Sequence, residues 1–191
     1  MTDKNKQLSE TANLLLTKVL LDHTKPVDVV FGAGVSDDMM AFFIKVAQNV
    51  TETFLSKFPE INDTLTINEL NGFKALLNEA IGVGYRIYYA EKIYVKKDDH
   101  FSKHSGPKFI EYLNKEFNDY FVNESKNPDE ITPSYIVEVS KQLAFTLFNE
   151  GIVKNGLTNK KLPQEFIDSS LMQPLWLILM GYTLSVLQEK Y

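Results

Sequence analysis

The residues best suited to metal chemistry lie close together in one polar segment. Its two carboxylates and two imidazoles, the ligand types that hold zinc and related metals, belong to Asp98, Asp99, His100 and His104. The two imidazoles would share one face of a helix. However, near-adjacent residues do not easily surround one ion, lysines crowd the segment, and Gly106-Pro107 indicates a loop before the next helix. We therefore favour an exposed loop, predict no cofactor, and keep a metal-dependent enzyme as an alternative.

Arg86 is the only arginine in the chain and the best candidate for a ligand contact. The residues three and four positions away on its helix are glycine, valine, tyrosine and alanine, so no carboxylate there pairs with it comfortably. A guanidinium so placed needs a partner from another helix, an exit to solvent, or an anionic ligand. Two interpretations stay open, a structural ion pair or solvent-reaching side chain, and an apolar ligand pocket. The pocket residues would be Arg86, Tyr85, Tyr88, Tyr89 and Trp176.

The composition excludes several kinds of chemistry. Without cysteine there is no disulfide, no catalytic thiolate and no cysteine-based zinc site. The net charge is −5, from 25 acids and 20 bases, and no basic run is present, so nucleic-acid binding is disfavoured. No nucleophile–base pair or phosphate-binding loop is recognisable, although 25 acids leave carboxylate pairs open.

The segment 27–38 contains a stretch that resembles known ligand-binding loops. Its GAGVS sequence, residues 32–36, follows an apolar run and precedes a helix. This resembles the start of a Rossmann fingerprint or the GAG-x-S loop of sirtuin-like NAD-binding proteins, and its second half resembles the turn of bacterial helix-turn-helix repressors. Asp37 and Asp38 would put negative charge against a pyrophosphate or a DNA phosphate. We therefore prefer an ordinary connector, with Ser36 capping the next helix.

The central element is predicted to be a long helix over 66–97. Thr66 and Glu69 form a capping box at its start, and apolar residues then recur mostly at three- and four-residue steps, the spacing of one helical face. An unbroken helix of this length would measure about 48 Å at 1.5 Å per residue, so other helices must pack along it or it must break. Gly82 and Gly84 mark the predicted break or close approach.

A second, apolar helix is predicted over 170–188. The stretch 169–188 has no charged residue, and its length matches the roughly 20 residues of a transmembrane helix. Its polar residues, proline and glycine, with no basic cluster beside it, disfavour a membrane anchor. A helix that is apolar on every side must be covered on every side, which predicts a bundle core or a homodimer interface. The interface candidates are Leu175, Trp176, Leu179 and Tyr182.

Together these elements predict an all-α fold, a single-domain bundle of about six or seven helices. Residues 1–7 are expected to fray and residues 8–191 to form the domain. The polar N-terminus lacks the apolar core of a signal peptide, so we expect a cytoplasmic protein. The favoured function is non-catalytic and exerted through protein contacts, in a regulatory, assembly or phage- or plasmid-type accessory role. A sensor or carrier of a small apolar ligand at Arg86 is the second hypothesis.

Overall fold

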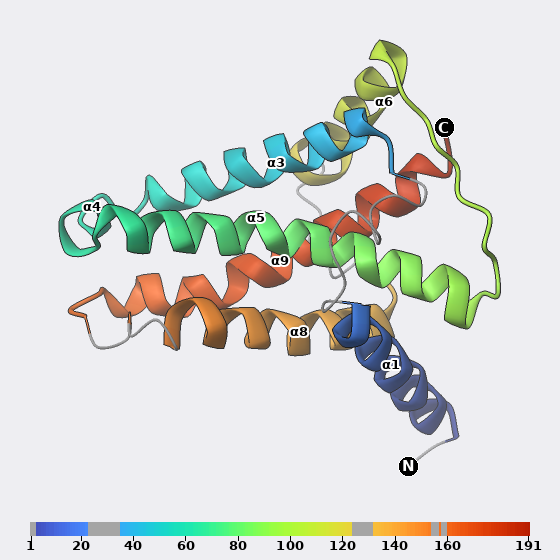
Figure 1. Cartoon of the computed structure of the whole chain (residues 1–191), viewed down its shortest axis with the longest axis horizontal. Coiled ribbons are helices and arrows are strands. Elements are labelled where there is room, and N and C mark those ends of the chain that lie inside the picture. The colour runs from blue at the N-terminus through green and yellow to red at the C-terminus, as the bar shows by residue number, and fades with distance from the viewer. Residues whose placement is uncertain (1–2, 23–34, 124–131, 154–156, 158–159) are drawn as a thin grey trace.

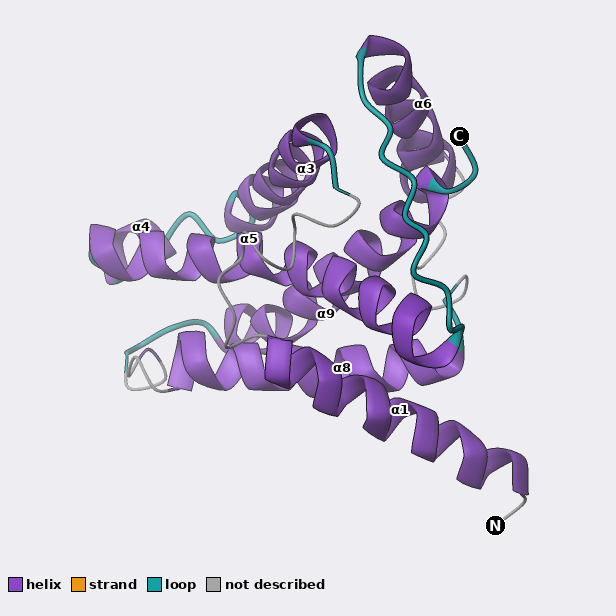
Figure 2. Cartoon of the chain, turned by 45° about the vertical axis from the view of Figure 1, so that its right-hand side comes forward, coloured by secondary structure: helices purple, strands orange, loops and turns teal. Residues whose placement is uncertain are grey.

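The computed structural model describes residues 3–22, 35–123, 132–153, 157 and 160–191. Every regular element among these residues is helical, so the all-α prediction is confirmed (Figure 2). The α-helices in this part of the chain are α1 (Asp3–Asp22), α3 (Asp37–Leu55), α4 (Ile61–Thr64), α5 (Ile67–Ala90), α6 (Pro107–Phe117), α8 (Ser134–Phe148) and α9 (Gln164–Gln188). Turns of π-helix extend three of them, namely η1 (Glu91–Val95), η2 (Asn118–Asn123) and η3 (Asn149–Val153).

The predicted central helix is confirmed, and it begins as the capping box requires. The Thr66 backbone N–H donates to Glu69 Oε2 at 2.8 Å, and the Glu69 N–H donates to Thr66 Oγ1 at 3.3 Å. α5 then runs without a break through Gly82 and Gly84 and continues as η1. Of the two predicted roles for the glycines, a break is therefore wrong.

The close approach is confirmed at Gly84. A Cβ atom at Gly84 would lie 2.0 Å from the Ile178 carbonyl oxygen, and one at Gly181 would lie 2.0 Å from the Ile81 carbonyl oxygen. The backbones of α5 and α9 thus touch where the two helices cross, and only glycine leaves room for that contact.

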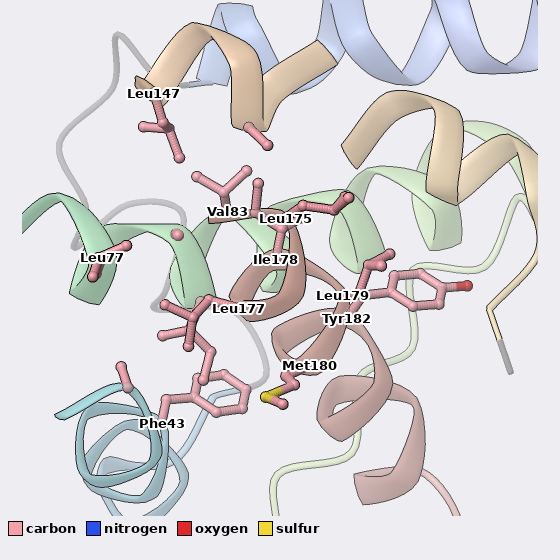
Figure 3. Close-up of a cluster of buried hydrophobic side chains, with 14 of the residues drawn as sticks. Phe43, Leu77, Val83, Leu147, Leu175, Leu177, Ile178, Leu179, Met180 and Tyr182 are labelled. Carbon is pink, nitrogen blue, oxygen red and sulfur yellow. The ribbon is translucent and has the colours of Figure 1, made fainter. Parts of the chain in front are cut away.

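The apolar C-terminal helix is covered on several sides within this chain. α9 packs most extensively against α5, then against α8, and also against α6 (Figure 1). Figure 3 shows Leu177 and Met180 directed toward Phe43 of α3, whereas Leu175 lies toward Leu147 of α8. α9 is also the one described helix that is long and apolar enough to cross a membrane, but 67% of its apolar window is buried inside the fold.

An aromatic cluster joins three helices near the N-terminal end of α9. Phe166 stacks on Phe54 of α3 at a ring-centre distance of 5.6 Å and contacts Phe73 of α5 at 5.5 Å. Phe58, just beyond α3, meets Phe166 edge-on at 5.4 Å. Since each aromatic side chain buries a large area, this cluster ties α3 to the α5–α9 pair.

The first described helix, α1, begins at Asp3. It packs on α8 and α5, while its first turns extend beyond the bundle (Figure 2). The Ser36 cap of α3 is confirmed, because its hydroxyl accepts the Met39 N–H at 3.2 Å. The GAGVS stretch, which we predicted to be an ordinary connector, covers residues 32–36, of which 32–34 lie outside the described part of the chain.

Candidate functional site

The five residues predicted to line one pocket lie in three different places. Tyr85 and Tyr88 are buried at the C-terminal end of α5, and Tyr89 stacks on Phe101 at a ring-centre distance of 4.9 Å. Trp176 is 41% exposed and lines a groove with residues of α3 and α6. Arg86 faces a different cavity between α3 and α5. Because α5 turns about 100° per residue, neighbours in the sequence point to different sides of the helix.

The cavity at Arg86, here the Arg86 pocket, has a volume of about 440 Å³. Its described walls are mostly apolar, with polar groups from Arg86, Asn78 and Glu79. Arg86 is only 4% exposed. The lining residues are Met40, Phe43, Ile44, Ala75, Asn78, Glu79, Ile81, Gly82 and Arg86. A mostly apolar cavity of this size with a few polar groups is typical of a small-molecule site.

Asn78 adds a polar group that no pattern in the sequence indicated. Its Oδ1 atom is buried and, within the described part of the chain, has no hydrogen-bond partner. Buried side-chain acceptors are usually satisfied by protein or water. The Asn78 side chain can therefore hydrogen-bond to a group in the Arg86 pocket.

The π-helical turn η1 buries two adjacent charged residues, Glu91 at 1% exposure and Lys92 at 5%. Such turns widen the helix and are frequent at functional sites. The Glu91 carboxylate accepts hydrogen bonds from the hydroxyl of Tyr182 at 2.8 Å, from the hydroxyl of Tyr135, and from Lys96 Nζ at 2.9 Å. A buried carboxylate is thereby held by three donors from three segments of the chain.

Both tyrosines act as donors in this arrangement. Burial raises the pKa of Tyr182 well above its ordinary value, and the neighbouring Glu91 carboxylate raises it further. Burial and the hydrogen bond to Glu91 likewise raise the pKa of Tyr135. The two hydroxyls therefore keep their protons at any physiological pH and direct them at Glu91.

A cavity of about 590 Å³ opens beside this carboxylate, and we call it the Glu91 pocket. Its walls combine the buried acid, aromatic rings, two lysines and aliphatic side chains. The lining residues are Glu91, Lys96, Tyr120, Pro133, Tyr135, Tyr182, Thr183, Val186, Leu187 and Lys190. The pocket is thus assembled from η1, the residues around the start of α8, η2 and the last turns of α9.

Lys92 lies in a separate polar cluster. This cluster links the C-terminal end of α9 to the loop that follows η1. Its Nζ atom lies 3.0 Å from Glu189 and 3.4 Å from Asp98, and it also donates to the His100 carbonyl. Burial alone would raise the pKa of Glu189, but hydrogen bonds from Tyr88 and Lys92 lower it overall. This cluster therefore holds the C-terminal end of α9 against the loop that follows η1.

The structure does not gather the four candidate metal ligands of the alternative hypothesis. Asp98 accepts the His100 backbone N–H at 2.9 Å, Asp99 is exposed, and the His104 ring lies against Phe109. No group of three or more histidine, aspartate or glutamate side chains in the described residues is arranged to hold a metal ion. The hypothesis of a metal-dependent enzyme at 98–104 therefore has no geometric support.

Three of the predicted interface residues are covered inside the chain. Leu175, Leu179 and Tyr182 are 6%, 1% and 4% exposed, and only Trp176 presents a substantial surface.

Glu91 was not among the predicted site residues, although the sequence contained a signal for it. Continuing the apolar steps of α5 from Tyr88 by three residues reaches Glu91, so an acid falls on the buried face.

Comparisons of the chain with protein-family models, with curated proteins and with solved structures find no match.

Proposed function

We propose that this protein is a non-catalytic sensor or carrier that binds a small, largely apolar carboxylate in the Arg86 pocket. The observation that carries the proposal is a buried guanidinium at the wall of a mostly apolar cavity of about 440 Å³. Arginine presents its N–H donors in a fixed fork that matches a carboxylate. With five donors it can serve a protein neighbour and a ligand at the same time.

The rest of the pocket supports the same ligand chemistry. Met40, Phe43 and Ile44 of α3 and Ile81 of α5 offer aliphatic and aromatic surface to an alkyl chain. Each buried methylene would contribute about 0.8 kcal/mol, so affinity should rise with chain length until the cavity is filled.

The test is thermal unfolding with matched ten-carbon probes. We expect decanoate to raise the melting temperature in a concentration-dependent way, and decanol or decylamine to do so much less, because only decanoate carries a carboxylate. Shorter carboxylates should bind more weakly in step with their length. If no carboxylate from six to twelve carbons stabilises the protein, the proposal is refuted.

Two variants test whether decanoate stabilises the protein by binding in the Arg86 pocket. Ala75→Leu partly fills the cavity from an exposed helical position and should weaken decanoate binding, whereas Ala75→Ser should leave it nearly unchanged. Arg86→Met keeps the aliphatic stem and removes the charge, which should reduce the preference for decanoate over decanol. Unchanged decanoate affinity in Ala75→Leu would place binding elsewhere.

A second candidate function, contact with another protein or with a second copy of the chain, is favoured by Trp176. Its partly exposed indole ring lines a groove of about 300 Å³ with Val50, Phe54, Phe117 and Met180. Tryptophan is enriched among residues that dominate interface energy. A homodimer through this groove remains our proposal for the oligomeric state.

Light scattering on a sizing column tests the dimer. We expect a dimeric mass for the unmodified chain and a monomeric mass for Trp176→Glu. Leu179→Glu is unsuitable for this purpose, because Leu179 is 1% exposed and a charge there would disrupt the core. A monomeric mass for the unmodified protein at micromolar concentration would contradict the homodimer.

A further inference from the structure

The Glu91 pocket contains an ammonium-binding position that the protein fills with its own side chain. Lys96 Nζ lies 2.9 Å from Glu91 Oε2, and the lysine side chain is 51% exposed while the carboxylate is 1% exposed. The other two donors, Tyr135 and Tyr182, come from packed helices. Among the donors to Glu91 in the described residues, Lys96 is therefore the one that can swing into solvent without disturbing the core.

The position that Lys96 Nζ occupies beside Glu91 would also suit the ammonium group of a ligand. A carboxylate offers about four lone-pair directions, and three are taken by the donors named above. Each tyrosine hydroxyl donates a hydrogen bond to Glu91, and its oxygen keeps lone pairs that can accept from an N–H group. A primary ammonium in the pocket would thus find a buried charge and neutral acceptors around it.

The pocket also holds the opposite charge. Lys96 and Lys190 both line it, and Lys190 is exposed at its rim. If a ligand ammonium replaced Lys96 on Glu91, the displaced Lys96 would lose its carboxylate partner. A ligand that carries its own carboxylate would supply one, so each charge in the pocket would remain paired.

We propose that the Glu91 pocket binds a zwitterionic amino acid, with its ammonium on Glu91 and its carboxylate between Lys96 and Lys190. Pro133, Val186 and Leu187 form apolar walls of the same pocket, which favours an aliphatic or aromatic side chain. A simple anion is disfavoured because it would face the buried carboxylate. A simple amine is disfavoured because it must compete with Lys96 and returns no partner to it. This site is separate from the Arg86 pocket and does not depend on it.

The experiment compares three probes of the same shape by titration calorimetry or by NMR shifts. L-leucine carries both charges, N-acetyl-L-leucine lacks the ammonium, and 3-methylbutylamine lacks the carboxylate. We expect leucine to bind at least about tenfold more tightly than either of the others, because each loses one charge-assisted contact. Equal binding of all three probes, or no leucine binding at millimolar concentration, would overturn the proposal.

Variants then separate the two charges. Lys96→Met removes the resident ammonium, so 3-methylbutylamine should bind more tightly than to the unmodified protein. Lys190→Ala should weaken leucine severalfold and leave 3-methylbutylamine unchanged, while Lys108→Met, an exposed lysine on α6, should change neither. Glu91→Gln should abolish leucine binding. Should Glu91→Gln fail to fold, the Lys96→Met result decides alone, and unaltered amine affinity in that variant would overturn the exchange.

Discussion

Glu69 makes two stabilising interactions at the start of the central helix. Its carboxylate accepts the Thr66 backbone N–H and also pairs with Lys160 at 3.0 Å, which joins the chain before α9 to the first turn of α5. The Thr66 backbone N–H, followed by Lys160 and the Thr66 hydroxyl, lowers the pKa of Glu69 from 4.5 to about 2. A carboxylate whose pKa is lower in the folded state stabilises that state only while it is ionised.

This predicts a particular response to acid. The stabilisation from Glu69 is complete above pH 4.5 and is lost as the pH falls from 4.5 toward 2. Glu69→Gln keeps a residue type that suits a capping box but removes the titration. In urea unfolding at a series of pH values, its midpoint should therefore fall less steeply through that window than the midpoint of the unmodified protein. Parallel pH profiles for the two proteins would show that Glu69 is not responsible.

Glu91 illustrates a second point at the scale of single residues. It lies in η1, where both it and the adjacent Lys92 are buried. The sequence placed an acid on the apolar face of α5 but could not supply its partners. Tyr135 and Tyr182 are 44 and 91 residues away, so only folding brings them to the carboxylate.

At the scale of elements, the α5–α9 crossing depends on the absence of side chains at two positions. Gly84→Ala would put a methyl group against the Ile178 carbonyl and the Tyr182 N–H, which are backbone atoms that cannot turn aside. We expect a loss of about 3 kcal/mol or more in the free energy of unfolding, measured by urea titration. Gly181→Ala should have a similar effect, because its methyl group would meet the Ile81 carbonyl.

Gly72 is the matched control on the same helix. A Cβ atom there would meet nothing within 4 Å, and the position is exposed. Because alanine is favoured over glycine within helices, Gly72→Ala should stabilise the protein by about 0.5–1 kcal/mol. Equal effects of Gly72→Ala and Gly84→Ala would mean that the backbones of α5 and α9 are not in contact at Gly84.

At the scale of the whole molecule, Phe166 contributes to holding α3 on the α5–α9 pair. Its ring contacts Phe54, Phe58 and Phe73, and it is fully buried. Phe166→Ala should cost about 3–5 kcal/mol in the free energy of unfolding, as expected for a large aromatic residue removed from a core. Phe145→Ala removes an equal side chain that is 56% exposed and should change stability by about 0.5 kcal/mol or less. Similar losses in both variants would argue against the described core.

The Phe166→Ala substitution should also weaken ligand binding in the Arg86 pocket. One wall of that pocket belongs to α3 and the other to α5, so loosening α3 moves Met40 and Phe43 relative to Arg86. If decanoate binds as proposed, its affinity should fall in Phe166→Ala at temperatures where the variant is still folded, and it should be retained in Phe145→Ala.

The sequence by itself determined the elements of this protein. Helical periodicity, the capping box at Thr66 and the Ser36 cap depend on residues at most a few positions apart, so they can be read without the fold. The same holds for the apolar C-terminal helix and for the prediction that Gly84 marks a close approach.

Only the tertiary structure decided which side chains share a site. Arg86 and Tyr85 are neighbours in the chain but face different sides of α5, whereas Glu91 and Tyr182 meet across 91 residues. The predicted set around Arg86 was therefore divided, and Glu91 was missed. Local patterns specify helices because hydrogen bonds within a helix span four residues. A pocket depends on the rotation and crossing of packed helices, and these follow from contacts between distant residues, such as the meeting of Gly84 with α9.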